Sequence, residues 1–249
     1  MQILGLALAV IVGLSLGLLG GGGSILTVPI FVYVLGFAAK QAIAMSLPVV
    51  GATSFVGAIR HWRNGNVQPR LALAFGGVAM VGAYVGARLA TFVSGQAQLT
   101  LLALAMIAAA VSMFRSGRAP MQERSTEPTA STAAIMAVGV GVGLLTGLVG
   151  IGGGFLVVPA LVVLAGVPMK QAIGTSLVVI AMNAMSGSLG YVGQVSIPWS
   201  FVGLFSAFAI AGILIGTSLV RFVSQGALKQ GFAGFLVLLG ALILIRNHS

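Results

Sequence analysis

Two glycine-rich runs are the residues of this chain most suited to binding chemistry. The first is Gly20 to Gly23 followed by Ser24, and the second is Gly150-Ile-Gly-Gly-Gly154. Glycine lets a backbone leave a helix and lets a ligand approach main-chain N–H groups closely. The N–H groups that open the following helix carry positive partial charge, so two such runs facing each other would attract an anion. The candidate residues are Gly22, Gly23, Ser24, Gly152, Gly153 and Gly154.

Close packing between helices is the alternative role for these glycines, because small residues let backbones approach. The duplication of the run favours a site. The apolar segments that follow, 24–37 and 154–167, are each only about 21 Å long as helices, short of the roughly 30 Å of hydrocarbon in a bilayer. Short, glycine-interrupted segments at matching positions of two halves are typical of transporter sites.

A polar stripe follows on the helix predicted after each short segment. Ser46 and Thr53 are seven residues apart, as are Ser176 and Asn183, so each pair shares one helix face. Thr175 adds a hydroxyl nearby. Hydroxyl and amide donors suit sulfonate or carboxylate oxygens, and hydrogen bonding between helices is the alternative role. Asn183 is the strongest candidate, because an amide in the middle of a membrane is costly to bury.

Arg88 is a further possible site residue, since it lies inside the apolar run 70–92. A cation within a membrane segment points to function, but the end of the run is near enough for the side chain to reach the interface instead. The two acidic residues are Glu123 and Glu127, and the chain has no cysteine. No membrane segment therefore carries a carboxylate or a thiol. We expect no catalytic group, no metal site and no cofactor, and therefore not an enzyme.

The composition places these residues in a membrane. Hydrophobic residues make up 59% of the chain and charged residues 6%, whereas a soluble domain has about 25% charged residues. Long apolar runs recur without the alternation of barrel strands. Helices satisfy their own backbone groups in lipid, so the sequence predicts an all-α integral membrane protein, a polytopic helical bundle.

The bundle divides into two halves. A polar stretch at 115–131, expected to be a cytoplasmic linker, separates a first transmembrane repeat, 1–114, from a second, 132–249. Each repeat has about five helical segments in the same order of lengths, including one short, glycine-interrupted segment. The predicted segments are 3–19, 24–37, 41–60, 70–92, 96–114, 132–149, 154–167, 171–190, 199–221 and 226–245.

The halves also repeat in sequence at an offset of 130 residues. The quartet Lys40-Gln-Ala-Ile43 falls on Lys170-Gln-Ala-Ile173, in register with the glycine runs. Chance matching of small apolar residues does not produce such a quartet, so the chain contains an internal duplication.

Basic residues in the loops predict that the two repeats are inverted. The loop near 60–70 holds Arg60, Arg63 and Arg70, whereas its counterpart, 191–198, has no charge. Because basic loops face the cytoplasm, we expect the first loop inside and the second outside. The same placement of cations at segment ends argues against nucleic acid as a partner, despite the net charge of +10.

The repeated motifs resemble those of the TauE/SafE family of sulfite and organosulfonate exporters. The second half carries Gly150-Ile-Gly-Gly-Gly-Phe-Leu-Val-Val-Pro159, Ala172-Ile-Gly-Thr-Ser-Leu177 and Gly193-Gln-Val195. The first half carries Gly20-Gly-Gly-Gly-Ser-Ile-Leu-Thr-Val-Pro29, Ala42-Ile-Ala-Met-Ser-Leu47 and Gly65-Asn-Val67. The resemblance covers nearly the whole chain. It implies transport of small sulfur-containing anions or related organic anions.

The leading hypothesis is a secondary transporter that exports a small anion, such as a sulfonate or sulfite, as a multi-pass protein of the cell inner membrane. The lack of membrane carboxylates fits an anion, since acidic sites favour cations. A negative interior also drives anions outward, by about 2.3 kcal/mol per charge per 100 mV. A passive anion channel and a membrane subunit of a larger complex are the alternatives. The expected partners are the anion, the lipid bilayer and a second copy of the chain.

Overall fold

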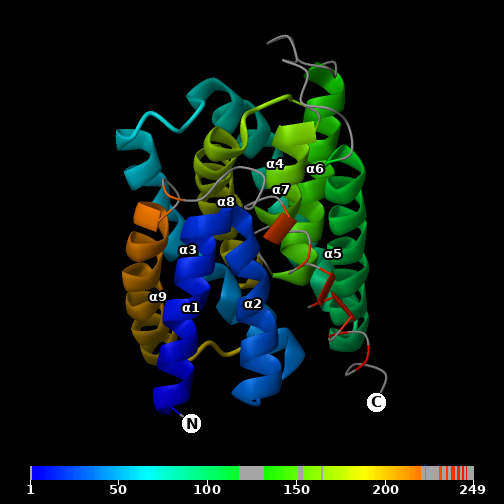
Figure 1. Cartoon of the computed structure of the whole chain (residues 1–249). Helices are drawn as coiled ribbons and strands as arrows, with labels where there is room; N and C mark the ends of the chain where they lie inside the picture. The colour runs from blue at the N-terminus through cyan, green and yellow to red at the C-terminus, as the bar shows by residue number, and fades with distance from the viewer. Residues whose placement is uncertain are drawn as a thin grey trace.

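A computed structural model describes residues 2–117, 132–150, 154–163 and 165–219, together with isolated positions between 222 and 245. Throughout this part of the chain the residues form helices and short connections, with no strand (Figure 1). The elements are α1 (Gln2–Leu19), a 3-10 turn η1 (Gly20–Gly23), α2 (Ser24–Pro29), a π-helical turn η2 (Ile30–Val34), α3 (Ala39–Arg63), α4 (Pro69–Leu89), a 3-10 turn η3 (Ala90–Phe92), α5 (Gly95–Gly117), α6 (Thr132–Val149), α7 (Gly154–Val163), α8 (Met169–Tyr191) and α9 (Trp199–Leu219).

The prediction of an all-α, polytopic membrane protein is confirmed. Four helices in the described ranges are long and apolar enough to cross a membrane: α3, α4 with the turn after it, α8 and α9. The short segments are indeed short, because the first is helical over Ser24–Val34, which are α2 and η2, and α7 has 10 residues. Helix α5 continues to Gly117, three residues into the predicted linker. Most of the predicted last segment, 226–245, lies outside the described residues.

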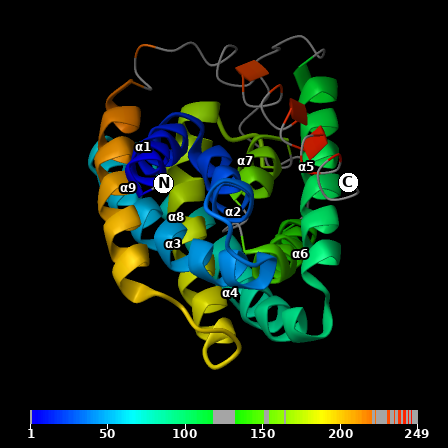
Figure 2. The ribbon, with the colours of Figure 1, turned by 90° about the horizontal axis from the view of Figure 1, so that it is seen from below.

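The first helix of each half packs closely on a helix of the other half, and glycines lie at the contact. A Cβ added to Gly13 in α1 would overlap Ala209 in α9, and a Cβ added to Gly143 in α6 would overlap Ala79 in α4. These two contacts join positions that are equivalent at the offset of 130 residues. Figure 2 shows the pair α1 and α9 together at one side of the bundle, with α3 and α8 between them and the pair α4 and α6.

Reciprocal contacts of this kind arise when two copies of a unit are related by a two-fold axis. The loop 64–68, between α3 and α4, and the loop 192–198, between α8 and α9, lie at opposite ends of the bundle in Figure 1. The orientation of the two repeats relative to a bilayer stays a prediction.

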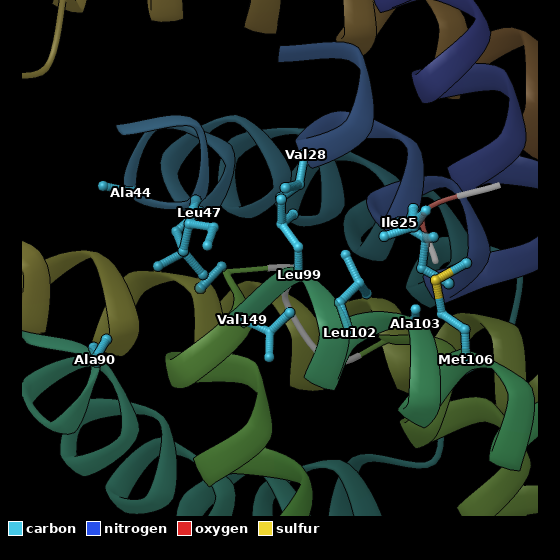
Figure 3. Close-up of a cluster of buried hydrophobic side chains, with 14 of the residues drawn as sticks. Ile25, Val28, Ala44, Leu47, Ala90, Leu99, Leu102, Ala103, Met106 and Val149 are labelled. Carbon is cyan, nitrogen blue, oxygen red and sulfur yellow. The ribbon is translucent and has the colours of Figure 1, made fainter. Parts of the chain in front are cut away.

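Buried apolar side chains from both halves form the core. In Figure 3, side chains of α2, α3, α5 and α6 meet in one cluster that contains Val28, Leu47, Leu99 and Val149. All four side chains are buried, with at most 3% of their surface exposed. The short helix α2 and the helix α3 are therefore held against the second half of the chain by apolar contact.

Candidate functional site

The chain leaves α1 and α6 at two glycines with left-handed backbone conformations. Gly20 has a φ of 64° and Gly150 has a φ of 76°. Residues with side chains rarely adopt this region, so the helices end where only glycine is comfortable. Both glycine runs interrupt helices, as the sequence predicts.

Each break packs on the polar stripe of the opposite half. A Cβ added to Gly20 would lie 2.9 Å from the hydroxyl oxygen of Ser176. Conversely, the hydroxyl group of Ser46 contacts the carbonyl oxygen of Gly150 as a hydrogen-bond donor. The two serines of the repeated motif therefore have equivalent roles: in each half, the serine contacts the glycine that ends the first helix of the other half.

The two glycine breaks also contact each other directly. A Cβ added to Gly21 would overlap main-chain atoms of Gly154, and a Cβ added to Gly154 would overlap Gly21 and Ile180 of α8. The main chains of the two halves therefore meet without any side chain between them. Gly22 lies in the turn η1 beside this contact, whereas Gly152 and Gly153 lie outside the described residues.

The first glycine run uses several of its polar groups internally. The N–H group and the hydroxyl group of Ser24 both donate to the carbonyl oxygen of Gly21, the hydroxyl at 2.6 Å. A Cβ added to Gly23 would overlap Leu16 of α1, so Gly23 serves close packing. The turn runs into α2 with helical backbone angles at Gly23. The amide of Ser24 is therefore not a free anion donor, in contrast to what the run alone predicts.

One face of α8 is directed at the glycine contact. Ser176, Ile180 and Asn183 are spaced four and three residues apart, so they lie along one side of the helix. Gly20 packs on Ser176, and Gly154 packs on Ile180. Asn183 is the next residue along this face, about one turn beyond the contact.

Asn183 is the outstanding polar group of this region. Its side chain is fully buried, and neither Oδ1 nor Nδ2 has a hydrogen-bond partner. Its counterpart, Thr53, is equally buried but donates its hydroxyl proton to the carbonyl oxygen of Val49 at 2.7 Å. A buried amide without partners costs about 1–3 kcal/mol, so Asn183 is the group that a polar ligand would satisfy.

Thr175 has a different task from the one its position predicts. Its hydroxyl oxygen accepts a hydrogen bond from the Gln68 backbone N–H at 3.0 Å, and the Gln68 side chain donates to Gln171 at 2.8 Å. These contacts dock the loop 64–68 on α8. In the other half, Gln41 donates to the carbonyl oxygen of Ser196 at 3.0 Å and docks the equivalent loop on α3.

Arg88 is not part of this region. Its side chain is exposed, and its guanidinium lies 5.5 Å from the centroid of the Tyr84 ring, on the outer surface of α4. The structure therefore does not bring Arg88 together with the glycine breaks. Its position suits an interfacial anchor.

Two further buried hydroxyl groups are not among the candidates predicted from the sequence. Thr27 in α2 and Ser54 in α3 are fully buried, and their hydroxyl oxygens have no hydrogen-bond partner. The sequence holds two signals for them: Thr27 follows the first glycine run closely, and Ser54 is adjacent to Thr53. No group of His, Cys, Asp or Glu side chains suited to a metal ion occurs among the residues that the structure describes.

Comparison with known proteins identifies the family of this arrangement. The family model described as sulfite exporter TauE/SafE matches residues 5–243. The chain is 34% identical to a probable membrane transporter protein of Xylella fastidiosa (strain 9a5c), over 94% of this chain and 91% of that protein. It is 28% identical to the probable membrane transporter protein MJ0441 of Methanocaldococcus jannaschii and 26% identical to the probable membrane transporter protein YdhB of Bacillus subtilis (strain 168). These matches cover 96% and 94% of this chain and 96% of each relative. No solved structure matches the chain. The chain belongs to the sulfite exporter TauE/SafE family.

Proposed function

We propose that this chain is a secondary transporter of the cell inner membrane that exports a small anion, such as a sulfonate or sulfite. Membership of a family described as sulfite exporters supports the substrate class. The names of these three relatives, each a probable membrane transporter protein, support transport as the activity.

The observation that carries the proposal is the buried amide of Asn183 without partners. An amide can donate two hydrogen bonds from its nitrogen, which suits the oxygens of a sulfonate or sulfite. The amide lies on the face of α8 that packs on Gly20 and Gly154. A substrate bound there would lie where the two halves of the chain meet.

The charges of the region favour an anion. Both acidic residues, Glu123 and Glu127, lie in the polar stretch between the halves, so α1 to α4 and α6 to α9 contain no carboxylate side chain. Nothing of like charge in these helices repels a bound anion. Neutral donors hold a singly charged anion without a compensating cation, and the membrane potential then drives that anion outward.

The direct contact between Gly21 and Gly154 favours a carrier over a passive channel. Main-chain atoms in contact leave no open path at this point, so a substrate that crosses between the two breaks passes only if they separate. Alternating access by movement of one repeat against the other supplies that separation.

Counterflow of labelled sulfite in liposomes that contain only this chain distinguishes a carrier from a channel, because a carrier gives counterflow and a channel does not. It also tests whether the chain acts without a larger complex.

Asn183→Leu tests the site itself. Binding of sulfite, thiosulfate, sulfonates and carboxylates to the purified variant is measured by calorimetry. We expect affinity to fall by about 10-fold to 100-fold, since a hydrogen bond to a charged ligand contributes about 1.5–3 kcal/mol.

Without ligand, the Asn183→Leu protein should melt no lower than the native protein, because leucine removes two buried polar atoms that have no hydrogen-bond partner. Ser188→Ala is the matched control on α8, since the Ser188 hydroxyl donates to the carbonyl oxygen of Ala184 on its own helix. Unchanged affinity in Asn183→Leu would place the site elsewhere. Lower stability with unchanged affinity would make Asn183 a structural residue.

A further inference from the structure

A groove on the outer surface of α3 leads into a basic pocket at the end of that helix. The groove has a volume of about 410 Å³ and lies between α3 and α8, lined by apolar side chains that include Phe55, Trp62 and Met185. The pocket has a volume of about 400 Å³ and is lined by Arg60, Arg63, Asn64 and residues of α3 and α9. Ile59 and Arg63 line both, so the two cavities adjoin.

The groove has the apolar, exposed lining that suits an acyl chain. Phe55, Trp62 and Met185 expose 58%, 54% and 63% of their surfaces, and in a membrane helix such surfaces face lipid. Trp62 lies next to the basic end of α3, as tryptophan does at the boundary between headgroups and hydrocarbon. From Phe55 to Arg63 the helix rises about 12 Å, which is a large part of one leaflet of the roughly 30 Å hydrocarbon core.

The pocket has the charge of a site for a phosphate headgroup. Arg60 and Arg63 are one helical turn apart, so they present their guanidinium groups on neighbouring positions. Arg60 is oriented by donating to the Ser218 hydroxyl oxygen at 2.7 Å. The described residues that line the pocket include no acidic residue. Among the described residues no carboxylate faces these two arginines, so their guanidinium groups are available to an anion, and arginine binds phosphate well.

We propose that this surface binds one anionic phospholipid, with the phosphate group against Arg60 and Arg63 and an acyl chain in the groove between α3 and α8. The binding is independent of the transported anion, because the groove opens outward and the glycine breaks lie inside the bundle. Basic pockets between membrane helices are typical binding sites for anionic lipid headgroups.

Native mass spectrometry of the full chain tests the proposal. The protein is incubated with phosphatidylglycerol and phosphatidylcholine of identical acyl chains, and retained lipid is counted. The native protein should retain phosphatidylglycerol in preference to phosphatidylcholine. Arg63→Gln leaves the hydrogen bond between Arg60 and Ser218 in place and should reduce that preference about fivefold, with a larger loss in the double variant that adds Arg60→Gln.

Two other variants separate the headgroup from the acyl chain. Met185→Trp fills the groove and should weaken retention of both lipids without changing the preference between them. Arg88→Gln is the control, an exposed arginine at the far end of α4, and should change neither. Equal retention of the two lipids by the native protein, or an equal loss in Arg88→Gln, would overturn the proposal. Binding of inorganic phosphate with the same dependence on Arg63, but without retained lipid, would overturn it too.

Discussion

Replacing Gly21 by alanine should force the two halves of the protein apart. A Cβ at this position would overlap the Cα, carbonyl carbon and carbonyl oxygen of Gly154. All three are main-chain atoms, so no side chain can rotate away. The turn η1 and the start of α7 must therefore shift as units. This contact joins the turn that follows α1 to the first residue of α7.

The size of the effect follows from the rigidity of the contact. Overpacking a core usually costs about 1–3 kcal/mol. Because the neighbouring atoms here are main chain and cannot rotate away, we expect a cost of about 3 kcal/mol. A change of that size lowers the melting temperature of a chain this long by roughly 6–12 °C. Gly77→Ala is the matched control, because a Cβ at Gly77 in α4 would meet no atom within 4 Å. Alanine favours helix over glycine by about 0.5–1 kcal/mol, so Gly77→Ala should melt at or slightly above the native temperature.

The assay is thermal unfolding of both variants in the same detergent, followed by tryptophan fluorescence and by loss of the monodisperse peak in gel filtration. Gly154→Ala should resemble Gly21→Ala, since its Cβ would overlap Gly21 and Ile180. If Gly21→Ala melts within about 2 °C of Gly77→Ala, the two glycine breaks do not touch in the protein and the reasoning fails.

Three further outcomes are expected. Ser46→Ala should destabilise the protein by about 0.5–1.5 kcal/mol and more than Ser176→Ala, because both hydroxyl groups contact a carbonyl oxygen of their own helix, Ile43 at 2.7 Å and Ile173 at 2.8 Å, and only Ser46 also contacts the Gly150 carbonyl oxygen of the other half; equal melting temperatures would contradict this. Thr175→Val should speed hydrogen exchange at the Gln68 amide about fivefold, since that amide loses its acceptor, whereas unchanged exchange would show that the loop is held without it. Cysteines placed at the exposed positions Asn64 and Val192 should be labelled from opposite sides of the membrane by an impermeant reagent, and labelling from one side would exclude inverted repeats.

The sequence predicts the architecture well, because apolar runs and an internal duplication extend over most of its length. Long apolar segments predict membrane helices, and the shared glycine runs locate the breaks in α1 and α6. A row of four glycines does not say which one turns the chain, since all four tolerate a positive φ. The structure assigns that conformation to Gly20, the first of them.

The site was less predictable, because hydrogen-bond partners depend on loops from the other half. Thr175 and Asn183 are both candidates in the sequence, yet the Thr175 hydroxyl oxygen accepts a hydrogen bond from the Gln68 amide and the Asn183 side chain has no partner. Gln41 and Gln171 were visible only as markers of the repeat, and their role in docking loops depends on packing between halves. The Arg88 side chain could point inward or outward in sequence, and packing decides for the outer surface.

The glycine-to-alanine packing of α1 on α9 has a consequence for biosynthesis. The partner of α1 begins about 180 residues after α1 ends. At the usual rate of about 5–20 residues per second, the ribosome takes about 10–40 s to produce it. Throughout that interval the glycine-lined surface of α1 is in the membrane without its partner. In contrast, α6 finds α4 already inserted when it emerges. Completion of the protein therefore waits for α9, and a chain that stops before Trp199 leaves α1 as a target for membrane quality control.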